Sequence, residues 1–94
     1  MFDNQRYITR GIDAEIPFEL QIFIWECIDR MPKPKDYFQI FTFEAVGILQ
    51  KIIHISEQPE YCMNYFIPYG NPITAKIYVI DDGDHSTMLL SGEY

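Results

Sequence analysis

The sequence predicts an α+β fold for a single domain spanning residues 1–94, with a mainly antiparallel sheet of about five strands packed against one long helix. Three observations lead to this class. One amphipathic segment is bounded by prolines, several runs are rich in aromatic and β-branched residues, and an Asp-Gly pair separates the last two runs. Because strongly twisted strands can curl, a partly closed barrel is the alternative.

The first third of the chain is expected to hold a short strand and the long helix. Residues 6–12 are β-prone, and Gly11 closes the run. The helix is expected over residues 17–31, because proline suits its first turn and two prolines at positions 32 and 34 end it. Apolar residues at i, i+3 and i+4 spacing predict its core-facing stripe: Leu20, Phe23, Ile24, Cys27, Ile28 and Met31.

The same helix carries a second apolar stripe, formed by Phe18, Ile22 and Trp25 at i, i+4 and i+7. A single core face does not require this stripe. Large aromatic residues anchor protein interfaces, and an exposed patch of this kind is costly unless something covers it. The stripe therefore predicts a binding surface for a protein partner or a second copy. The alternative is that the aromatic residues around 61–69 cover it within the monomer.

The remaining strands are expected over residues 36–44, 49–57 and 61–67, followed by a closing hairpin over residues 75–94. In the second of these strands the alternation allows two assignments, and we expect Ile53 and Ile55 to face the core. The hairpin is expected to place four apolar residues on its core face: Ile77, Val79, Met88 and Leu90.

The hairpin tip is the sharpest candidate for a chemical site. A two-residue Asp82-Gly83 turn is expected, which crowds three carboxylates and one imidazole between Asp81 and His85. Carboxylates with an imidazole can ligate a divalent ion, and Asp82, Asp84 and His85 are the candidate ligands. The calcium-loop pattern is absent, so a solvated acidic turn is the competing interpretation.

Charge and composition exclude several classes. The formal net charge is −7, and the acids outnumber the bases mainly after position 36, which opposes nucleic-acid binding. No apolar stretch is long enough to span a bilayer, and the N-terminus lacks a secretory pattern. We therefore expect a cytoplasmic protein without a membrane partner. Cys27 and Cys62 are expected to be buried, reduced thiols.

Four runs of the sequence resemble a bacterial family known as domain of unknown function number 960. They are RYITRG (6–11), IPFELQIFIWECID (16–29), QKIIH (50–54) and AKIYVIDDGDHSTMLL (75–90). The similarity extends over nearly the whole chain. It implies an origin in bacteria, including their mobile elements, and it assigns no activity, cofactor, partner or catalytic residue.

The leading functional hypothesis is a non-enzymatic protein-interaction module that uses the second apolar stripe and needs no cofactor. The first alternative is a divalent-metal or small-ligand binding protein that uses the Asp81–His85 turn. Nucleophilic catalysis would pair Cys62 with His54 or His85, or Ser86 with His85. No nucleophile elbow, phosphate-binding loop or HExxH helix accompanies these pairs. Mimicry of nucleic acid is a further alternative, motivated by the acidic charge.

Overall fold

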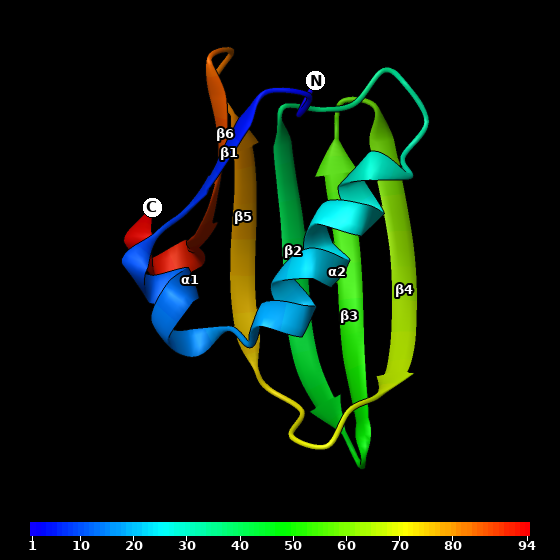
Figure 1. Ribbon diagram of the computed structural model, residues 1–94. Helices are drawn as coiled ribbons and strands as arrows, with labels where there is room; N and C mark the ends of the chain where they lie inside the picture. The colour runs from blue at the N-terminus through cyan, green and yellow to red at the C-terminus, as the bar shows by residue number, and fades with distance from the viewer.

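The computed structural model describes residues 1–94 and consists of one six-stranded sheet with two helices in front of it (Figure 1). The elements in chain order are β1 (Gln5–Ile8), α1 (Arg10–Glu15), α2 (Phe18–Asp29), β2 (Phe38–Val46), β3 (Leu49–Glu57), β4 (Glu60–Pro68), β5 (Ala75–Asp81), β6 (His85–Leu90) and the 3₁₀ turn η1 (Ser91–Glu93).

The strand order across the sheet is β1-β6-β5-β2-β3-β4. Strand β1 runs parallel to β6, and every other neighbouring pair is antiparallel. The long β2–β3 and β3–β4 hairpins form one side of the sheet, and the N-terminal strand β1 lies beside β6 on the other (Figure 1). The outer strands are therefore β1 and β4.

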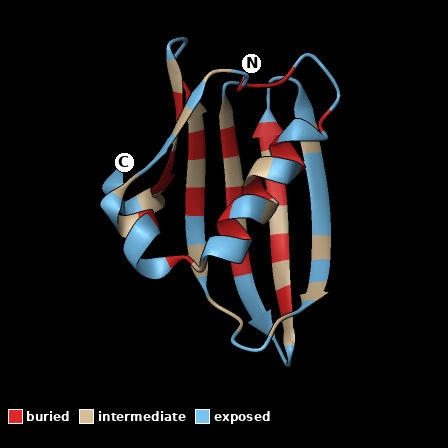
Figure 2. Ribbon diagram, viewed as in Figure 1, coloured by how far each residue is buried: buried red, intermediate tan, exposed pale blue.

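The core lies between the helices and one face of the sheet. Along β2, Gln39, Phe41 and Phe43 are buried while the residues between them are half-buried, as expected for side chains that alternate across a strand. The same alternation appears as red bands on the strands in Figure 2. The core cluster comprises Phe2, Ile12, Ile16, Leu20, Ile24, Cys27, Ile28, Phe41, Phe43, Ile52, Ile77, Val79 and Met88.

The predicted fold class, a sheet of about five strands packed against one long helix, is wrong. The chain is mostly sheet, with 47% of its residues in strands and 22% in helices. There are six strands, and α2 has 12 residues and shares the covered face with α1. The sheet is open, which also overturns the partly closed barrel.

Helix α1 was missed because Gly11 reads as the end of a strand. The side chain of Thr9 caps this helix by accepting a hydrogen bond from the amide of Ile12 at 3.3 Å. From the C-terminus, the Glu93 carboxylate accepts hydrogen bonds from the Thr9 hydroxyl at 2.6 Å and the Gly11 amide at 3.2 Å. A tertiary contact from 82 residues away thus supports a short helix that local propensity does not favour.

Two details of strand facing and register also differ from expectation. In β3, Ile52, His54 and Ser56 are buried, so Ile53 and Ile55 face away from the helices. At the hairpin tip Asp81 pairs with Ser86 and the Asp82 amide donates to the His85 backbone oxygen at 3.0 Å, so the turn lies at Gly83 and Asp84 instead of Asp82 and Gly83. The Asp82 carboxylate holds this turn by accepting hydrogen bonds from the amides of residues 84 and 85, at 3.2 and 3.1 Å.

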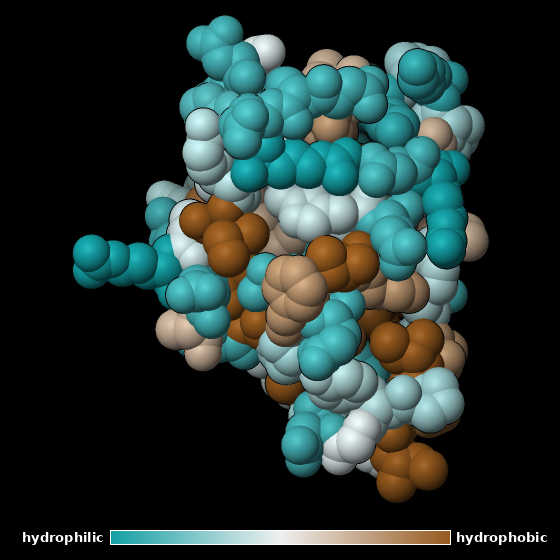
Figure 3. All heavy atoms as spheres, viewed as in Figure 1, coloured by the Kyte–Doolittle hydropathy of each residue, from teal (hydrophilic) through white to brown (hydrophobic).

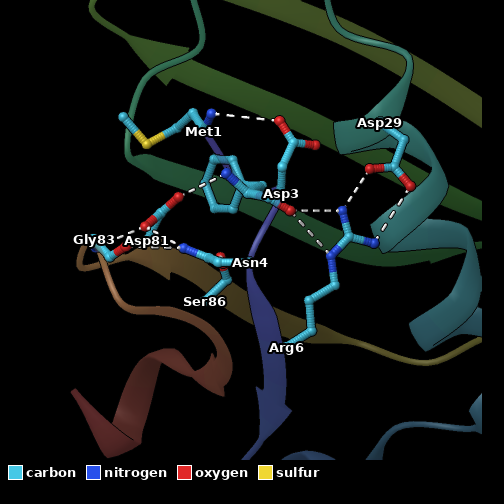
Figure 4. A network of polar contacts seen from close by, with 9 residues as sticks. Met1, Asp3, Asn4, Arg6, Asp29, Asp81, Gly83 and Ser86 are labelled. Atoms are coloured by element: carbon cyan, nitrogen blue, oxygen red, sulfur yellow. Dashed lines mark hydrogen bonds and ion pairs between the residues drawn. The ribbon is translucent and has the colours of Figure 1, made fainter.

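The N-terminal segment is anchored in the sheet by one carboxylate (Figure 4). Asp81 is buried and accepts hydrogen bonds from the amide of Phe2 at 2.6 Å, the side chain of Asn4 at 3.0 Å and the amide of Gly83 at 2.8 Å. Burial alone would raise the pKa of Asp81, but these hydrogen bonds outweigh burial and hold that pKa below its ordinary value. Phe2 itself is fully buried and has a positive φ of 66°.

We expect Asp81→Asn to lower the free energy of unfolding by about 2 kcal/mol, because a charge-assisted acceptor for three donors is lost. The matched control is Asp84→Asn, three residues along the same hairpin, where the carboxylate is exposed. The control should change stability by less than about 0.5 kcal/mol. Urea unfolding followed by circular dichroism measures both. Equal effects of the two substitutions would contradict the anchoring role.

Candidate interaction surfaces

The predicted stripe on α2 is divided by the structure. Phe18 and Ile22 are exposed, at 69% and 42% of their surface. Trp25 is half-buried and packs against the core cluster, and the Arg6 guanidinium lies 4.7 Å from the centre of its ring. Arg6 also pairs with Asp29 at the end of α2 (Figure 4). The chain's own residues therefore cover part of Trp25, and the exposed part of the stripe is Phe18 and Ile22.

Beside Phe18 there is a hollow of about 440 Å³ between the end of β1 and the start of α2, with Ile8, Ile16 and Gln21 among its lining residues. On this side of the molecule the apolar residues form separate patches divided by hydrophilic ones (Figure 3). The helical side thus offers a small apolar site at Phe18 and no continuous apolar surface.

A larger apolar surface lies on the opposite side of the sheet, which we call the open face. It consists of the outward-pointing strand residues, and neither helix packs on it. The central outward residues, read from the strand register, are Phe38, Ile40 and Thr42 of β2, Ile53 and Ile55 of β3, Cys62 and Asn64 of β4, Tyr78 and Ile80 of β5, and Thr87 and Leu89 of β6. An antiparallel sheet with one solvated face ordinarily alternates apolar with polar residues, so this composition is unusual.

Charged residues on the open face lie toward the ends of β2, β3 and β4, and Lys76 near the start of β5 is level with Thr42 and Ile53. Glu44, Lys51 and Lys76 lie toward the end formed by the β2–β3 turn, and Glu57 and Glu60 lie at the β3–β4 turn. The Lys51 ammonium is 3.8 Å from the Glu44 carboxylate. In a protein with a net charge of −7, the outward residues of β2 and β3 between these charges are all uncharged.

The C-terminal residue covers part of the open face. The Tyr94 ring lies edge-on to Phe38 and Tyr78, with centroid distances of 5.6 and 5.5 Å. Phe38 and Tyr78 contact each other at 5.0 Å, so the three rings form one aromatic cluster on β2 and β5. Strands β3 and β4 lie outside this cluster.

At the hairpin tip, the structure brings two of the three candidate ligands together. The Nε2 atom of His85 lies 3.1 Å from the Asp82 carboxylate, whereas the Asp84 carboxylate contacts neither. Asp81 points inward to the N-terminal segment instead. The structure contains no group of three or more His, Cys, Asp or Glu side chains placed to hold a metal ion. The local density of acids seen in the sequence is used for turn and anchoring hydrogen bonds.

The proposed nucleophile pairs are not formed. His54 is buried on the helix-covered face, whereas Cys62 is exposed on the open face, so the expectation that Cys62 is buried is wrong. The Ser86 hydroxyl donates to the Asn4 side chain at 2.6 Å instead of to His85. Neither histidine therefore lies beside a nucleophile.

Sequence reasoning missed a buried polar group at His54. Its Nε2 donates to the Gln39 side-chain oxygen at 2.6 Å, and the Gln39 amide donates to the backbone oxygen of Asp36 at 2.8 Å. The ring stacks on Phe41 at 4.0 Å, and Nδ1 is buried without a partner. Burial lowers the pKa of His54 to about 4, so this imidazole is neutral and has no access to a substrate.

Together these features define a small single-sheet domain with one helix-covered face and one open face. The chain belongs to the DUF960 family, described as a Staphylococcal protein of unknown function, which matches residues 5–93. Its fold is similar to that of a protein of unknown function from Enterococcus faecalis, with a TM-score of 0.85 and 24% identity over 98% of this chain and 92% of that one. No curated protein matches the sequence. No helix has the length and apolar character needed to cross a membrane.

The buried His54 predicts a specific pH dependence of stability. Its ordinary pKa is 6.5 and its folded pKa is about 4, so between these values only the unfolded chain binds a proton. The free energy of unfolding is therefore highest above pH 6.5, and it decreases as the pH falls toward 4, by at most ~1.4 kcal/mol per pH unit. Urea unfolding between pH 7 and 4 should show this slope, and His54→Gln should reduce it. An identical slope in the variant would show that other groups cause the loss.

Proposed function

We propose that this protein is a small, non-enzymatic, cytoplasmic interaction module that binds a protein partner or a second copy of itself through the open face. The observation that carries this proposal is the uncharged, mostly apolar row of outward residues at the centre of β2 and β3, on a sheet face on which no helix packs. Leaving such a surface in water is unfavourable, and extended exposed apolar patches mark interaction sites.

Several features support the other parts of the proposal. The nucleophile pairs suggested by the sequence are separated, and His54 is enclosed, which favours binding over catalysis. The two cysteines are unpaired, in agreement with a reducing compartment. The open face carries three glutamates and two lysines, a balance unsuited to a phosphate backbone.

Phe18 and Ile22 form a second candidate surface on the other side of the molecule. Phe18 is 69% exposed and borders the hollow beside β1. A short apolar segment of a partner could fill this hollow. The two surfaces can be tested separately because they lie on opposite sides of the sheet.

We expect Ile55→Lys to weaken binding at least tenfold, because a charge at the centre of an apolar interface loses its hydration without gaining a partner. Phe18→Lys is the matched control for the helical side. The measurement combines molar mass in solution with affinity capture from the native cell, using variants whose circular dichroism matches that of the unmodified protein. The open-face assignment fails if Ile55→Lys keeps both the mass and the captured partners. If only Phe18→Lys abolishes self-association or partner capture, the binding surface lies on the helical side.

A further inference from the structure

We propose that the occupant of the open face is a second copy of this chain, packed face to face with its strands antiparallel, so that Lys51 of each copy pairs with Glu57 of the other. This inference rests on the proposed function, because it names the partner of the same face. It is carried by the position of charge on β3 and by that strand's outward apolar residues, which are half-buried and on which no helix packs.

Strand β3 has a self-complementary outward side. Its outward residues, at two-residue spacing, are Leu49, Lys51, Ile53, Ile55 and Glu57. The second copy is related to the first by a 180° rotation about an axis that lies between the two sheets, perpendicular to the strands, and passes over position 54 of β3. This rotation places Lys51 opposite Glu57 and Ile53 opposite Ile55. Facing sheets pack about 10 Å apart, a distance that a lysine and a glutamate side chain bridge together.

The same rotation suits the rest of the face. Each strand then faces its own copy, and the end of β3 that carries Lys51 faces the end that carries Glu57, whereas Lys76, which is level with Ile53, faces Tyr78 of the other copy. These are the only two basic residues after Lys35, and both point outward on the open face. Packing with parallel strands would instead place Glu57 and Glu60 near their own copies. Opposed like charges are unfavourable, so the antiparallel arrangement is favoured.

The two charges are available for pairing. Glu57 forms no ion pair within the chain and is exposed, and its backbone amide is held by the Asp36 carboxylate at 3.1 Å. Lys51 is 30% exposed, and its ammonium lies 3.8 Å from the Glu44 carboxylate and 5.8 Å from the centre of the Phe66 ring. The Tyr94 cluster lies on β2 and β5, so it borders the axis at β3 without covering it.

The molecule is large enough for such an interface. It measures 37 × 27 × 20 Å, and the shortest dimension is that of one sheet plus one helix layer. A face of the two longer dimensions accommodates the ~800 Å² per partner that stable interfaces bury. The net charge of −7 opposes association, but the outward residues around the axis on β2 and β3 are uncharged, and charges farther apart than ~8 Å are screened at physiological salt.

Charge exchange at the two β3 positions tests this arrangement. We expect the unmodified protein to dimerise in sedimentation velocity measured at protein concentrations from about 5 to 500 µM, because interfaces of this size have dissociation constants in the micromolar range or below. Lys51→Glu and Glu57→Lys should each weaken the dimer at least tenfold, because both symmetric pairs become repulsive. The double variant, which exchanges the two charges, should recover the original dissociation constant within about threefold.

Matched controls make the same charge changes away from the open face. They are Lys33→Glu in the loop before β2 and Asp13→Lys on α1, both exposed, and both should leave dimerisation unchanged. A monomer at every concentration, or a double variant as weak as the single ones, would overturn the proposal. These results can be told apart from a failure of the proposed function. If the protein is a monomer but Ile55→Lys abolishes the capture of another protein, the open face still binds a partner, and that partner is not a second copy.

Discussion

The structure is governed by one packing constraint: the chain has helices for only one face of its sheet. Both helices, together with Phe2, pack on the same side of the six strands and complete a single core. Nothing comparable remains for the other side, where the C-terminal Tyr94 covers a small area over Phe38 and Tyr78. The central outward residues of the inner strands are nevertheless mostly isoleucine, tyrosine and phenylalanine, together with leucine and threonine. The proposed interaction role is based on these apolar side chains, which lie on a sheet face that no helix covers.

The hairpins and the core stripe of α2 could be predicted from the sequence because they depend on local periodicity. Strand β3 was predicted with its observed bounds, and five of the six predicted helix core residues are buried, with Phe23 half-buried against the core. The direction of the β3 faces was predicted the wrong way round. Apolar residues occupy both sides of this strand, so alternation alone does not show which side meets the helix.

The errors arise where distant contacts decide the local structure. Helix α1 depends on Glu93, and the parallel pairing of β1 with β6 is made across the two ends of the chain. Phe2 takes a positive φ because its amide is bound by Asp81 and its side chain fills the core. The open face was also missed for this reason, since it becomes visible only once both helices are placed on the same side. The sequence pointed to the stripe at Phe18 because helical spacing is readable locally, whereas a sheet face is assembled from several strands.

The central claim is that outward isoleucines of β3 are covered when the protein is assembled. The most direct measurement is an isotope-filtered NOE experiment on a mixture of isoleucine-methyl-labelled and unlabelled chains at high concentration. The account predicts intermolecular contacts between the methyl groups of Ile53 and Ile55. Intermolecular contacts confined to Ile22 on α2, or none at all while both β3 methyl groups remain solvent-exposed, would contradict it.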